Sequence, residues 1–304
     1  MRYSGEGTQE NPYIPEDFTG FLHCIAQTDS YVKLESDIDA AADSGYEGIL
    51  YEPVTFNCKE CYADELKKIT GATVCANNAF YVGSSGSDNR KSVRNIGFID
   101  WSFKQNGNTS SGAGNLFKIG DYFTLYGCSF SVQSAGQNRG LIYFSGVAAP
   151  SVSRCAFYVK YSESTTNGAI SGSVKLDRCN FILDGGTVPM GSDFFGPGNS
   201  GASVLCTQVG VVIKNAVLKY DGSATKKAFG INANSAFNYL VFETSCTSEI
   251  SGTITVENNN NQGLTLFVTN GIEKLTASER TTCHSITEAQ LKDADYLTEI
   301  GFFP

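Results

Sequence analysis

Carboxylates in the middle of the chain are the residues whose type could best support bond cleavage. Hydrolysis of a glycosidic bond uses two carboxyl groups about 5–10 Å apart, one as acid and one as nucleophile or base. Asp177 or Asp184 could face Asp121 or Asp100 from neighbouring units of a repeating fold. Their spacing does not fix such a pairing, and isolated aspartates on turns commonly accept hydrogen bonds from nearby backbone N–H groups. Asp177, Asp184 and Asp121 are therefore candidates for catalysis, with an ordinary surface role as the alternative.

Other catalytic signals are sparse. A lyase would place basic side chains beside acids, and Lys160, Lys175 and Arg178 are scattered candidates for that role. Two histidines leave few carriers for imidazole acid–base catalysis. The chain has no phosphate-binding loop, nucleophile elbow, HExxH sequence or dinucleotide-binding fingerprint. We therefore expect a protein that is not an enzyme, with polysaccharide hydrolase or lyase as the open alternative.

The segment CKEC, with Cys58 and Cys61, is the best candidate for metal binding. Structural zinc sites usually show a second closely spaced ligand pair, which this sequence lacks. Scattered residues could complete a site: His23, Cys24, Cys75, Cys283 and His284. Packed, reduced thiols are the preferred interpretation, so we expect no metal and no cofactor.

The segment ESDID could bind calcium through Asp37 and Asp39 together with a neighbouring acid. A strand explains the same residues more simply, because Leu34 and Ile38 would point inward while the acids face water. We prefer the strand.

Four aromatic residues, Tyr158, Tyr161, Phe194 and Phe195, could contact a ligand, although each could equally be packed. They lie in or near segments that a rigid scaffold could display as loops. These segments are 104–114, 133–139, 161–168 and 185–201.

The composition of the 304 residues favours many short strands. Apolar residues make up 41% and charged residues only 17%, and the 32 glycines far outnumber the 7 prolines. The net charge of −9, without a cluster of lysine or arginine, argues against a nucleic-acid partner. No stretch approaches the roughly 20 apolar residues that span a bilayer, so we expect no membrane partner. The first residues lack the pattern of a signal peptide, which for a complete sequence predicts synthesis in the cytoplasm.

A recurring hexamer predicts the fold. It has apolar residues at its first and last positions and a small or apolar residue at its fourth. The copies are FIDWSF (98–103), LYGCSF (125–130), VSRCAF (152–157) and LDRCNF (176–181), with weaker copies IKNAVL (213–218) and ISGTIT (250–255). Their fourth positions are Trp101, Cys128, Cys155, Cys179, Ala216 and Thr253. Intervals of 24 to 37 residues between these positions suit a solenoid whose coils carry insertions.

The cysteines of these hexamers fit the interior of such a stack. Ten cysteines would suggest disulfides in a small secreted chain, but this chain is large. Cys128, Cys155 and Cys179 each lie in a short apolar run, where a free thiol behaves as a small buried hydrophobe. We expect them to be reduced and to lie directly over one another.

A second short strand precedes each hexamer from LYGCSF on, another follows the last copy, and glycine- and asparagine-rich segments supply the corners. The strand candidates are NLFKIG (115–120), LIYFSG (141–146), GAISGS (168–173), ASVLCT (202–207), KAFGIN (227–232) and GLTLFV (263–268). Stacked coils bury an apolar column and pair their backbone groups in parallel ladders. Parallel connections are nearly always right-handed. The expected fold is therefore all-β: a single-stranded right-handed parallel β-helix, or solenoid, with short capping elements at both ends.

Both ends of the chain differ from the repeats. Residues 16–28 could form a short helix, and 286–300 another after a Ser285 or Thr287 cap. Such elements would cover terminal coils, whose bare edges invite polymerisation. We expect an N-terminal cap with the first coils over 1–79, the parallel β-helix over 80–275, and a C-terminal capping or attachment segment over 276–304.

The motifs at the two ends of the chain resemble those of a known group of proteins. The opening GEGTQENPYI…YVKLESDID is similar to the G-x-G-T-x-x-N-P-Y-x-I and Y-x-K-L-x-x-D-I-D motifs of β-helix proteins of bacterial surfaces and gut bacteriophages. The closing LKDADYLTEIGFFP resembles the D-x-x-Y-L-x-x-I-G-F ending of phage-encoded structural proteins. The resemblance is to right-handed, pectate-lyase-like parallel β-helix proteins such as phage tail spikes, fibres and decoration proteins.

This resemblance implies a bacteriophage virion protein, commonly a homotrimer, that contacts other virion proteins and a host-surface polysaccharide. Its location would be the virion, after synthesis in the host cytoplasm. The family includes glycan-cleaving and inert spikes, so a polysaccharide depolymerase on the same scaffold is one alternative. A bacterial surface adhesin is the other.

Overall fold

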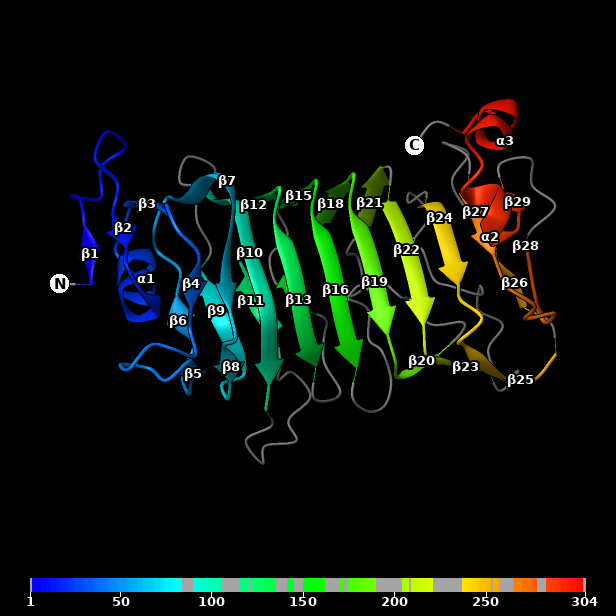
Figure 1. Ribbon diagram of the computed structural model, residues 1–304, viewed down its shortest axis with the longest axis horizontal. Helices are drawn as coiled ribbons and strands as arrows, with labels where there is room; N and C mark the ends of the chain where they lie inside the picture. Colours follow the sequence, from blue (N-terminus) through cyan, green and yellow to red (C-terminus); the bar gives the residue numbers. More distant parts are fainter. Residues whose placement is uncertain are drawn as a thin grey trace.

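The chain folds into a parallel β-solenoid, as the sequence predicts (Figure 1). Strands hold 53% of the residues and helices 9%, so the fold is all-β. The structure is a computed structural model. It describes residues 2–83, 90–104, 115–120, 122–134, 141–144, 150–161, 170–171, 174–189, 204–207, 209–220, 237–252, 254–256, 265–277 and 283–302.

The largest sheet runs along the stack as a parallel ladder with two rows of strands. The first row contains β3 (Tyr31–Lys33), β7 (Glu60–Thr70), β10 (Lys91–Phe103), β12 (Phe123–Tyr126), β15 (Ser151–Ser153), β18 (Val174–Asp177) and β21 (Val204–Thr207). The second row contains β4 (Ile38–Asp39), the later parts of β7 and β10, β13 (Ser129–Ser134), β16 (Ala156–Tyr161), β19 (Asn180–Asp184), β22 (Val209–Lys214), β24 (Phe237–Phe242), β27 (Thr265–Val268) and β29 (Cys283–Ser285). Parallel pairing of strands therefore begins before residue 80 and continues past residue 275, the bounds expected for the β-helix.

Shorter parallel sheets and strand pairs close the other sides of the coils. One sheet contains β6 (Val54–Thr55), β9 (Asn78–Val82), β11 (Asn115–Ile119), β14 (Ile142–Phe144) and β17 (Ile170–Ser171). Farther along lie β20 (Thr187–Pro189), β23 (Val217–Tyr220) and β25 (Thr247–Ile250), then β26 (Ile254–Val256) with β28 (Leu275–Ala277). β5 (Ile49–Leu50) and β8 (Thr73–Val74) extend the main sheet in the first coils.

The winding is right-handed. In Figure 1 the strands nearest the viewer, β13, β16, β19 and β22, run downward while the stack advances from the N-terminal end on the left to the right. A front that descends while the axis advances to the right describes a right-handed coil. This is the hand that parallel crossovers adopt almost without exception.

A column of stacked phenylalanines forms the centre of the core. Phe98, Phe130, Phe157 and Phe181 occupy one register position on successive coils. Their ring centroids lie 5.7, 4.7 and 4.6 Å apart, with nearly parallel planes. All four rings are buried. Each coil therefore covers the ring of the one before it, as the hexamers predict.

The cysteines of the hexamers lie at the corner that precedes this column. Cys128, Cys155 and Cys179 are buried and free, which confirms the expected reduced core thiols. The residue before each one has a positive φ: 63° at Gly127, 54° at Arg154 and 51° at Arg178. This left-handed conformation turns the chain between the two rows of the main sheet. Burial raises the pKa of the Cys179 thiol to about 11, so it stays protonated at neutral pH.

Two of the other hexamers occupy different positions from those predicted. Val93 pairs with Leu125 and Phe98 with Phe130, so the segment that matches LYGCSF is VRNIGF (93–98), whereas Trp101 pairs with Val132. In IKNAVL, Ala216 follows the left-handed Asn215 at the corner between β22 and β23, which is a different corner from that of Cys179. The prediction that Trp101 and Ala216 share the cysteine column is wrong, because FIDWSF is offset by five residues and because IKNAVL repeats the local pattern at a different corner.

The hexamer ISGTIT also falls outside the cysteine column. Its Ile250 ends β25, which belongs to a different sheet from β13, β16 and β19. Thr253 lies outside the described residues.

The intervening strands are confirmed at most of the predicted places. β11, β14 and β17 form the expected second column. ASVLCT and GLTLFV are also strands, β21 and β27, but they pair within the main sheet. KAFGIN (227–232) lies outside the described residues.

A helix caps the N-terminal end of the stack. α1 (Phe18–Ile25) begins at Asp17, whose side chain accepts a hydrogen bond from the Gly20 N–H. The buried rings of Phe18 and Phe21 contact the core, with centroids 6.0 Å from Trp101 and 6.3 Å from Phe80 respectively. The helix therefore covers the apolar interior of the first coils. The preceding β1 (Tyr3–Ser4) and β2 (Ile14–Pro15) form a small antiparallel pair.

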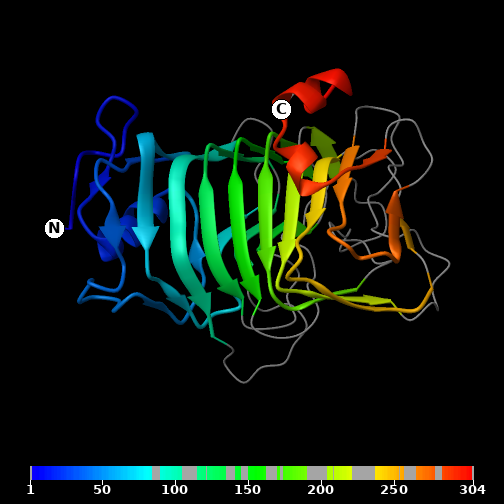
Figure 2. The same cartoon turned by 45° about the vertical axis from the view of Figure 1, so that its right-hand side comes forward.

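The C-terminal segment contains two short helices instead of the single predicted one. α2 (Glu288–Leu291) begins at Thr287, one of the two predicted caps, which forms a capping box with Gln290. Asp293 then caps a new helix, α3 (Ala294–Glu299). Leu297 and Phe302 of this segment pack against Val241 and Val268 on the outer face of the main sheet. Figure 2 shows the segment lying against the strands near the C-terminal end of the stack.

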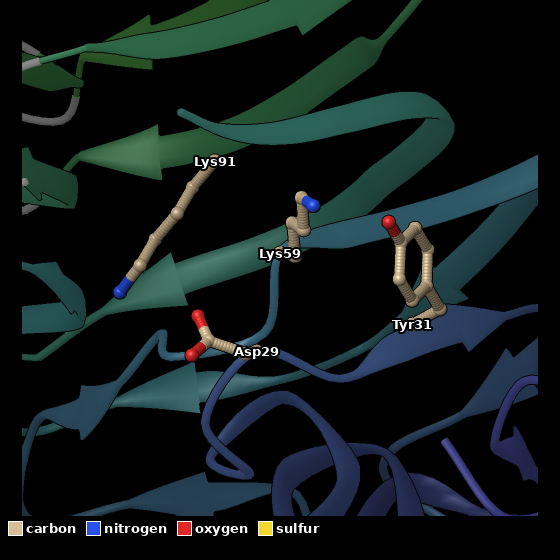
Figure 3. A pocket seen from close by; sticks show the side chains of 4 residues that line it. All are labelled: Asp29, Tyr31, Lys59 and Lys91. Atoms are coloured by element: carbon tan, nitrogen blue, oxygen red, sulfur yellow. The ribbon is translucent and has the colours of Figure 1, made fainter. Parts of the chain in front are cut away.

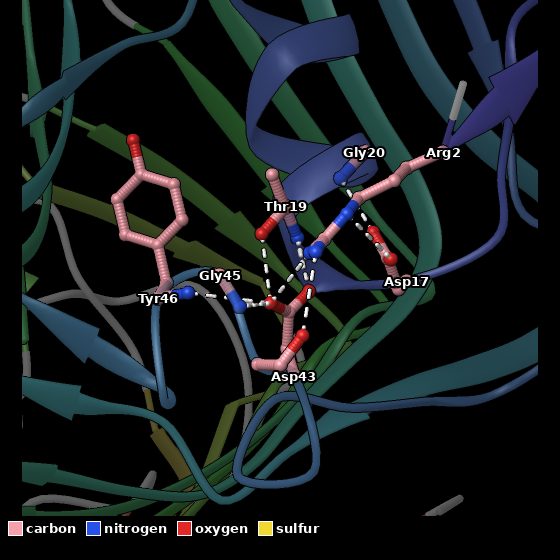
Figure 4. A network of polar contacts seen from close by, with 8 residues as sticks. Arg2, Asp17, Thr19, Gly20, Asp43, Gly45 and Tyr46 are labelled. Carbon is pink, nitrogen blue, oxygen red and sulfur yellow. Dashed lines mark hydrogen bonds and ion pairs between the residues drawn. The ribbon is translucent and has the colours of Figure 1, made fainter.

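The N-terminal cap is tied to the first coils by one buried carboxylate (Figure 4). Asp43 accepts hydrogen bonds from the Thr19 N–H at 2.7 Å, the Thr19 hydroxyl at 2.8 Å and the Gly45 N–H at 2.6 Å. Its side chain has 0% exposure and pairs with Arg2 Nη1 at 2.9 Å. Burial raises the pKa of Asp43, but the hydrogen bonds from Thr19, Gly45 and Tyr46 outweigh it and hold the pKa well below its usual range.

We predict that Asp43→Asn lowers the free energy of unfolding by about 3 kcal/mol, because the amide replaces a buried carboxylate that accepts hydrogen bonds from Thr19, Gly45 and Arg2. In the native chain this contribution is complete above the unfolded-state aspartate pKa of about 3.9 and falls away as the pH drops below it. Urea unfolding of both proteins at a series of pH values measures the effect. Asp39→Asn, at the exposed carboxylate that ends β4, serves as the control. Equal stability of Asp43→Asn and native protein at neutral pH would contradict the assigned role.

Candidate functional site

The structure does not bring the predicted carboxylates together in the part of the chain that it describes. Asp177 ends β18 and Asp184 ends β19, and both strands lie three rungs of the main sheet, about 14 Å, from β10 with Asp100. Asp177 pairs with Arg178, with Nε 3.1 Å from Oδ2. Asp100 accepts a hydrogen bond from the Ser131 hydroxyl at 3.2 Å. Asp121 lies outside the described residues.

Asp184 belongs to a polar network that joins three coils. Its carboxylate accepts hydrogen bonds from the Tyr158 hydroxyl at 2.5 Å and from Asn215 Nδ2 at 2.7 Å. Lys214 Nζ lies 3.6 Å from Oδ2 and 5.3 Å from the centre of the Tyr158 ring. With 9% exposure, this carboxylate is largely enclosed by its own partners.

The network shifts the pKa values of both its acids. Burial raises the pKa of Asp184, but the hydrogen bonds from Asn215 and Tyr158 and the charge of Lys214 outweigh it, so the pKa is lowered. The hydrogen bond to Asp184, followed by burial, raises the pKa of Tyr158 to about 12. A carboxylate that stays ionised and has all these partners is better suited to hold neighbouring coils together than to donate a proton.

The other predicted site residues are dispersed. Tyr161 is buried at 7% exposure, which removes it from the surface aromatic candidates. Lys160, Lys175 and Arg178 lie exposed on different strands or corners. Phe194 and Phe195 lie outside the described residues, as do most of the loops 104–114, 133–139, 161–168 and 185–201.

The thiols of the CKEC segment are packed in the core beneath α1. Cys58, Cys61 and Cys24 are buried and free. Burial raises the pKa of each thiol, to about 12 for Cys24. In the described ranges, no group of three or more His, Cys, Asp and Glu side chains is arranged to hold a metal ion.

The acids of the ESDID segment have backbone partners instead. Asp37 accepts a hydrogen bond from the Lys68 N–H at 2.9 Å, and Asp39 accepts one from the Ala41 N–H at 3.0 Å. Ile38 is buried between them, as the strand interpretation predicts.

A more coherent set of surface residues lies on the outer face of the first row of the main sheet. Lys33, Tyr62, Arg94 and Tyr126 occupy one outward register position on four successive coils. Arg154, at the corner of the next coil, continues the series. We call these five residues the tyrosine–cation ladder. Successive rungs of a sheet are about 4.8 Å apart, so aromatic and cationic groups alternate at that spacing along the stack.

Contacts within the ladder hold its side chains against the sheet. The Arg94 guanidinium lies over the Tyr62 ring, 5.1 Å from its centre, and that of Arg154 lies 5.6 Å from the centre of the Tyr126 ring. Exposed cation–π contacts of this kind are worth about 0.5–1 kcal/mol each. Tyr126 is still 38% exposed. The ladder is therefore ordered and accessible at the same time.

Carboxylates on both sides balance part of the ladder's charge. Lys33 Nζ lies 2.9 Å from Asp64 Oδ2, and Arg94 Nε lies 3.5 Å from Glu60 Oε1. The hydrogen bond to Asp64 raises the pKa of Lys33. Within the described residues Arg154 forms no ion pair. The face thus combines ring surfaces, hydrogen-bond donors and acceptors, which suits a polar polymer with apolar ring faces.

The sequence analysis did not identify the ladder. Tyr126 is the second residue of the hexamer LYGCSF, and Arg154 is the third residue of VSRCAF. For Tyr126, the signal in the sequence was its place two residues before the interior residue Cys128, where the side chain points outward. Only the register between coils shows that Arg94 and Tyr126 are neighbours.

Comparisons of the chain with models of protein families, with curated protein sequences and with solved structures each returned no match. No described helix is long and apolar enough to cross a membrane.

We predict that Asp184→Asn lowers the pKa of Tyr158 from about 12 toward the ordinary tyrosine value near 10, because the variant loses the charged acceptor. The free energy of unfolding should fall by about 1–3 kcal/mol. Tyrosine absorbance titration detects the shift, and Tyr158→Phe identifies the responsible residue. Lys175→Gln, at an exposed lysine on β18, should change neither quantity. A Tyr158 pKa that stays near 12 in Asp184→Asn would refute the network.

Proposed function

We propose that this protein is a non-enzymatic structural component of a bacteriophage particle that binds a host-surface polysaccharide along its outer face. The tyrosine–cation ladder is the observation that carries the binding proposal. Tyrosine and arginine are the residue types that most often dominate binding surfaces. Their repetition at the spacing of the coils suits a ligand that is itself a chain of repeating units.

Two features support a binding role over cleavage. Asp177 on β18 and Asp184 on β19 both lie three rungs of the main sheet, about 14 Å, from Asp100 on β10, beyond the distance at which carboxyl pairs cleave glycosides. Asp184 is also fully engaged by Tyr158, Asn215 and Lys214. A stack whose coils share backbone ladders and a continuous core supplies the rigidity that a surface spike or fibre needs.

We predict that the full chain binds polysaccharides extracted from the surface of host bacteria without cleaving them. Tyr126→Ala and Arg154→Gln should each weaken binding about tenfold, because each removes an exposed member of the ladder. Biolayer interferometry measures the affinity. Tyr51→Ala is the matched control, because Tyr51 is 65% exposed and lies outside the ladder.

The same incubations test the enzymatic alternative. New reducing ends or unsaturated sugars that disappear in Asp177→Ala or Asp184→Ala would replace the binding proposal with a depolymerase. Binding to these polysaccharides that is insensitive to both ladder substitutions would reject the ladder as the site.

The placement in a virion rests on the terminal motifs GEGTQENPYI and DADYLTEIGF, which resemble those of phage structural proteins. We predict that antibodies against this chain decorate purified phage particles at a defined position in electron micrographs. Light scattering should give the mass of a trimer for the isolated protein. Particles without antibody label, from cells in which the chain is present, would count against the virion role.

A further inference from the structure

A pocket of about 250 Å³ opens on the same outer face as the ladder, near the N-terminal end of the stack (Figure 3). It is lined by Asp29, Tyr31, Lys59 and Lys91. Tyr31 pairs with Glu60, and Glu60 pairs with Ser92, so the lining residues come from three successive coils. The pocket is therefore built by the stacking of coils and not by a single loop.

The pocket has a surplus of positive charge in a chain whose net charge is −9. It contains two ammonium groups and one carboxylate, and neither Lys59 nor Lys91 forms an ion pair within the described residues. Lys59 Nζ lies 5.7 Å from the centre of the Tyr31 ring. Lys91 Nζ donates to the Phe56 carbonyl at 2.8 Å, which fixes the ammonium group at the pocket.

The partly buried position of Lys91 disfavours its charged form. Burial lowers the pKa of Lys91, and the nearby Cys58 and Asp29 only partly offset this. An added negative charge in the pocket would stabilise the ammonium form. Elsewhere on this face, Lys33 and Arg94 already have carboxylate partners.

The size and the lining of the pocket limit what it can hold. Pockets that enclose drug-sized ligands measure about 300–1,000 Å³, so this one suits a single sugar ring. The lysines supply donors for an anion, while the Asp29 carboxylate and the Tyr31 hydroxyl can bond sugar hydroxyls. We infer that the pocket binds a sugar residue that carries a carboxylate group.

Its position makes the pocket continuous with the ladder. Tyr31 and Lys33 lie two residues apart on β3 and therefore face the same side of the sheet. A polysaccharide that follows the ladder can place one acidic residue in the pocket. This inference rests on the proposed function and narrows its ligand to polymers that contain uronic acids.

The test titrates the full chain with fragments of polygalacturonate, alginate and hyaluronate and with their methyl esters, which keep the rings but lose the charge. Isothermal calorimetry should detect binding to at least one acid and a loss of about tenfold or more on its esterification. Lys59→Gln should weaken binding of that acid about tenfold, while Lys59→Arg should retain it. Lys68→Gln, at an exposed lysine of β7, the strand that begins one residue after Lys59, is the matched control and should bind normally.

The outcomes separate this inference from the proposed function. Equal affinity for acid and ester, or no effect of Lys59→Gln, would overturn the acidic subsite. If none of the three acids binds but a neutral polysaccharide binds in a way that depends on Tyr126, the subsite fails and the proposed function stands. If neither acidic nor neutral polysaccharides bind, the proposed function itself fails. Binding of single-stranded DNA with the same dependence on Lys59 would assign the pocket to a different class of ligand and overturn the inference.

Discussion

The structure depends on the parallel register between successive coils. Each coil pairs its backbone N–H and C=O groups with the coils before and after it, so equivalent residues lie directly over one another. Inside, this register stacks Phe130, Phe157 and Phe181 into one column. Outside, the same register aligns Tyr62, Arg94 and Tyr126. One geometric constraint thus builds both the core and the proposed binding face.

The fold could be predicted from the sequence because the interior tolerates few residue types at a given position. The segments LYGCSF, VSRCAF and LDRCNF repeat a small thiol and an aromatic ring, since each must pack under its neighbour. The prediction failed at Trp101 and Ala216 for two physical reasons. FIDWSF begins five residues after the segment that pairs with LYGCSF, and the corner at Asn215–Ala216 has the same left-handed conformation as the corner at Arg178–Cys179.

The candidate site could not be predicted in the same way, because outward positions carry no hydrophobic constraint. Tyr126 and Arg94 are 32 residues apart with an irregular insertion between them, and only the ladder pairing makes them neighbours. The partners of Asp184 come from β16 and from the end of β22. Spacing along the chain suggested that Asp184 could pair with another carboxylate, whereas the register surrounds it with Tyr158, Asn215 and Lys214.

The two ends of the solenoid are covered in different ways, and this has a consequence for the order of events during synthesis. α1 lies before the first coils in the chain, so its rings are present when the stack begins to wind. The apolar outer surface of Val241 and Val268 must instead wait for Leu297 and Phe302, which the ribosome adds later. Until then, the nascent chain exposes this apolar surface, and the same surface of another nascent chain could associate with it. The segment with Leu297 and Phe302 therefore shields this surface from association once it has been translated.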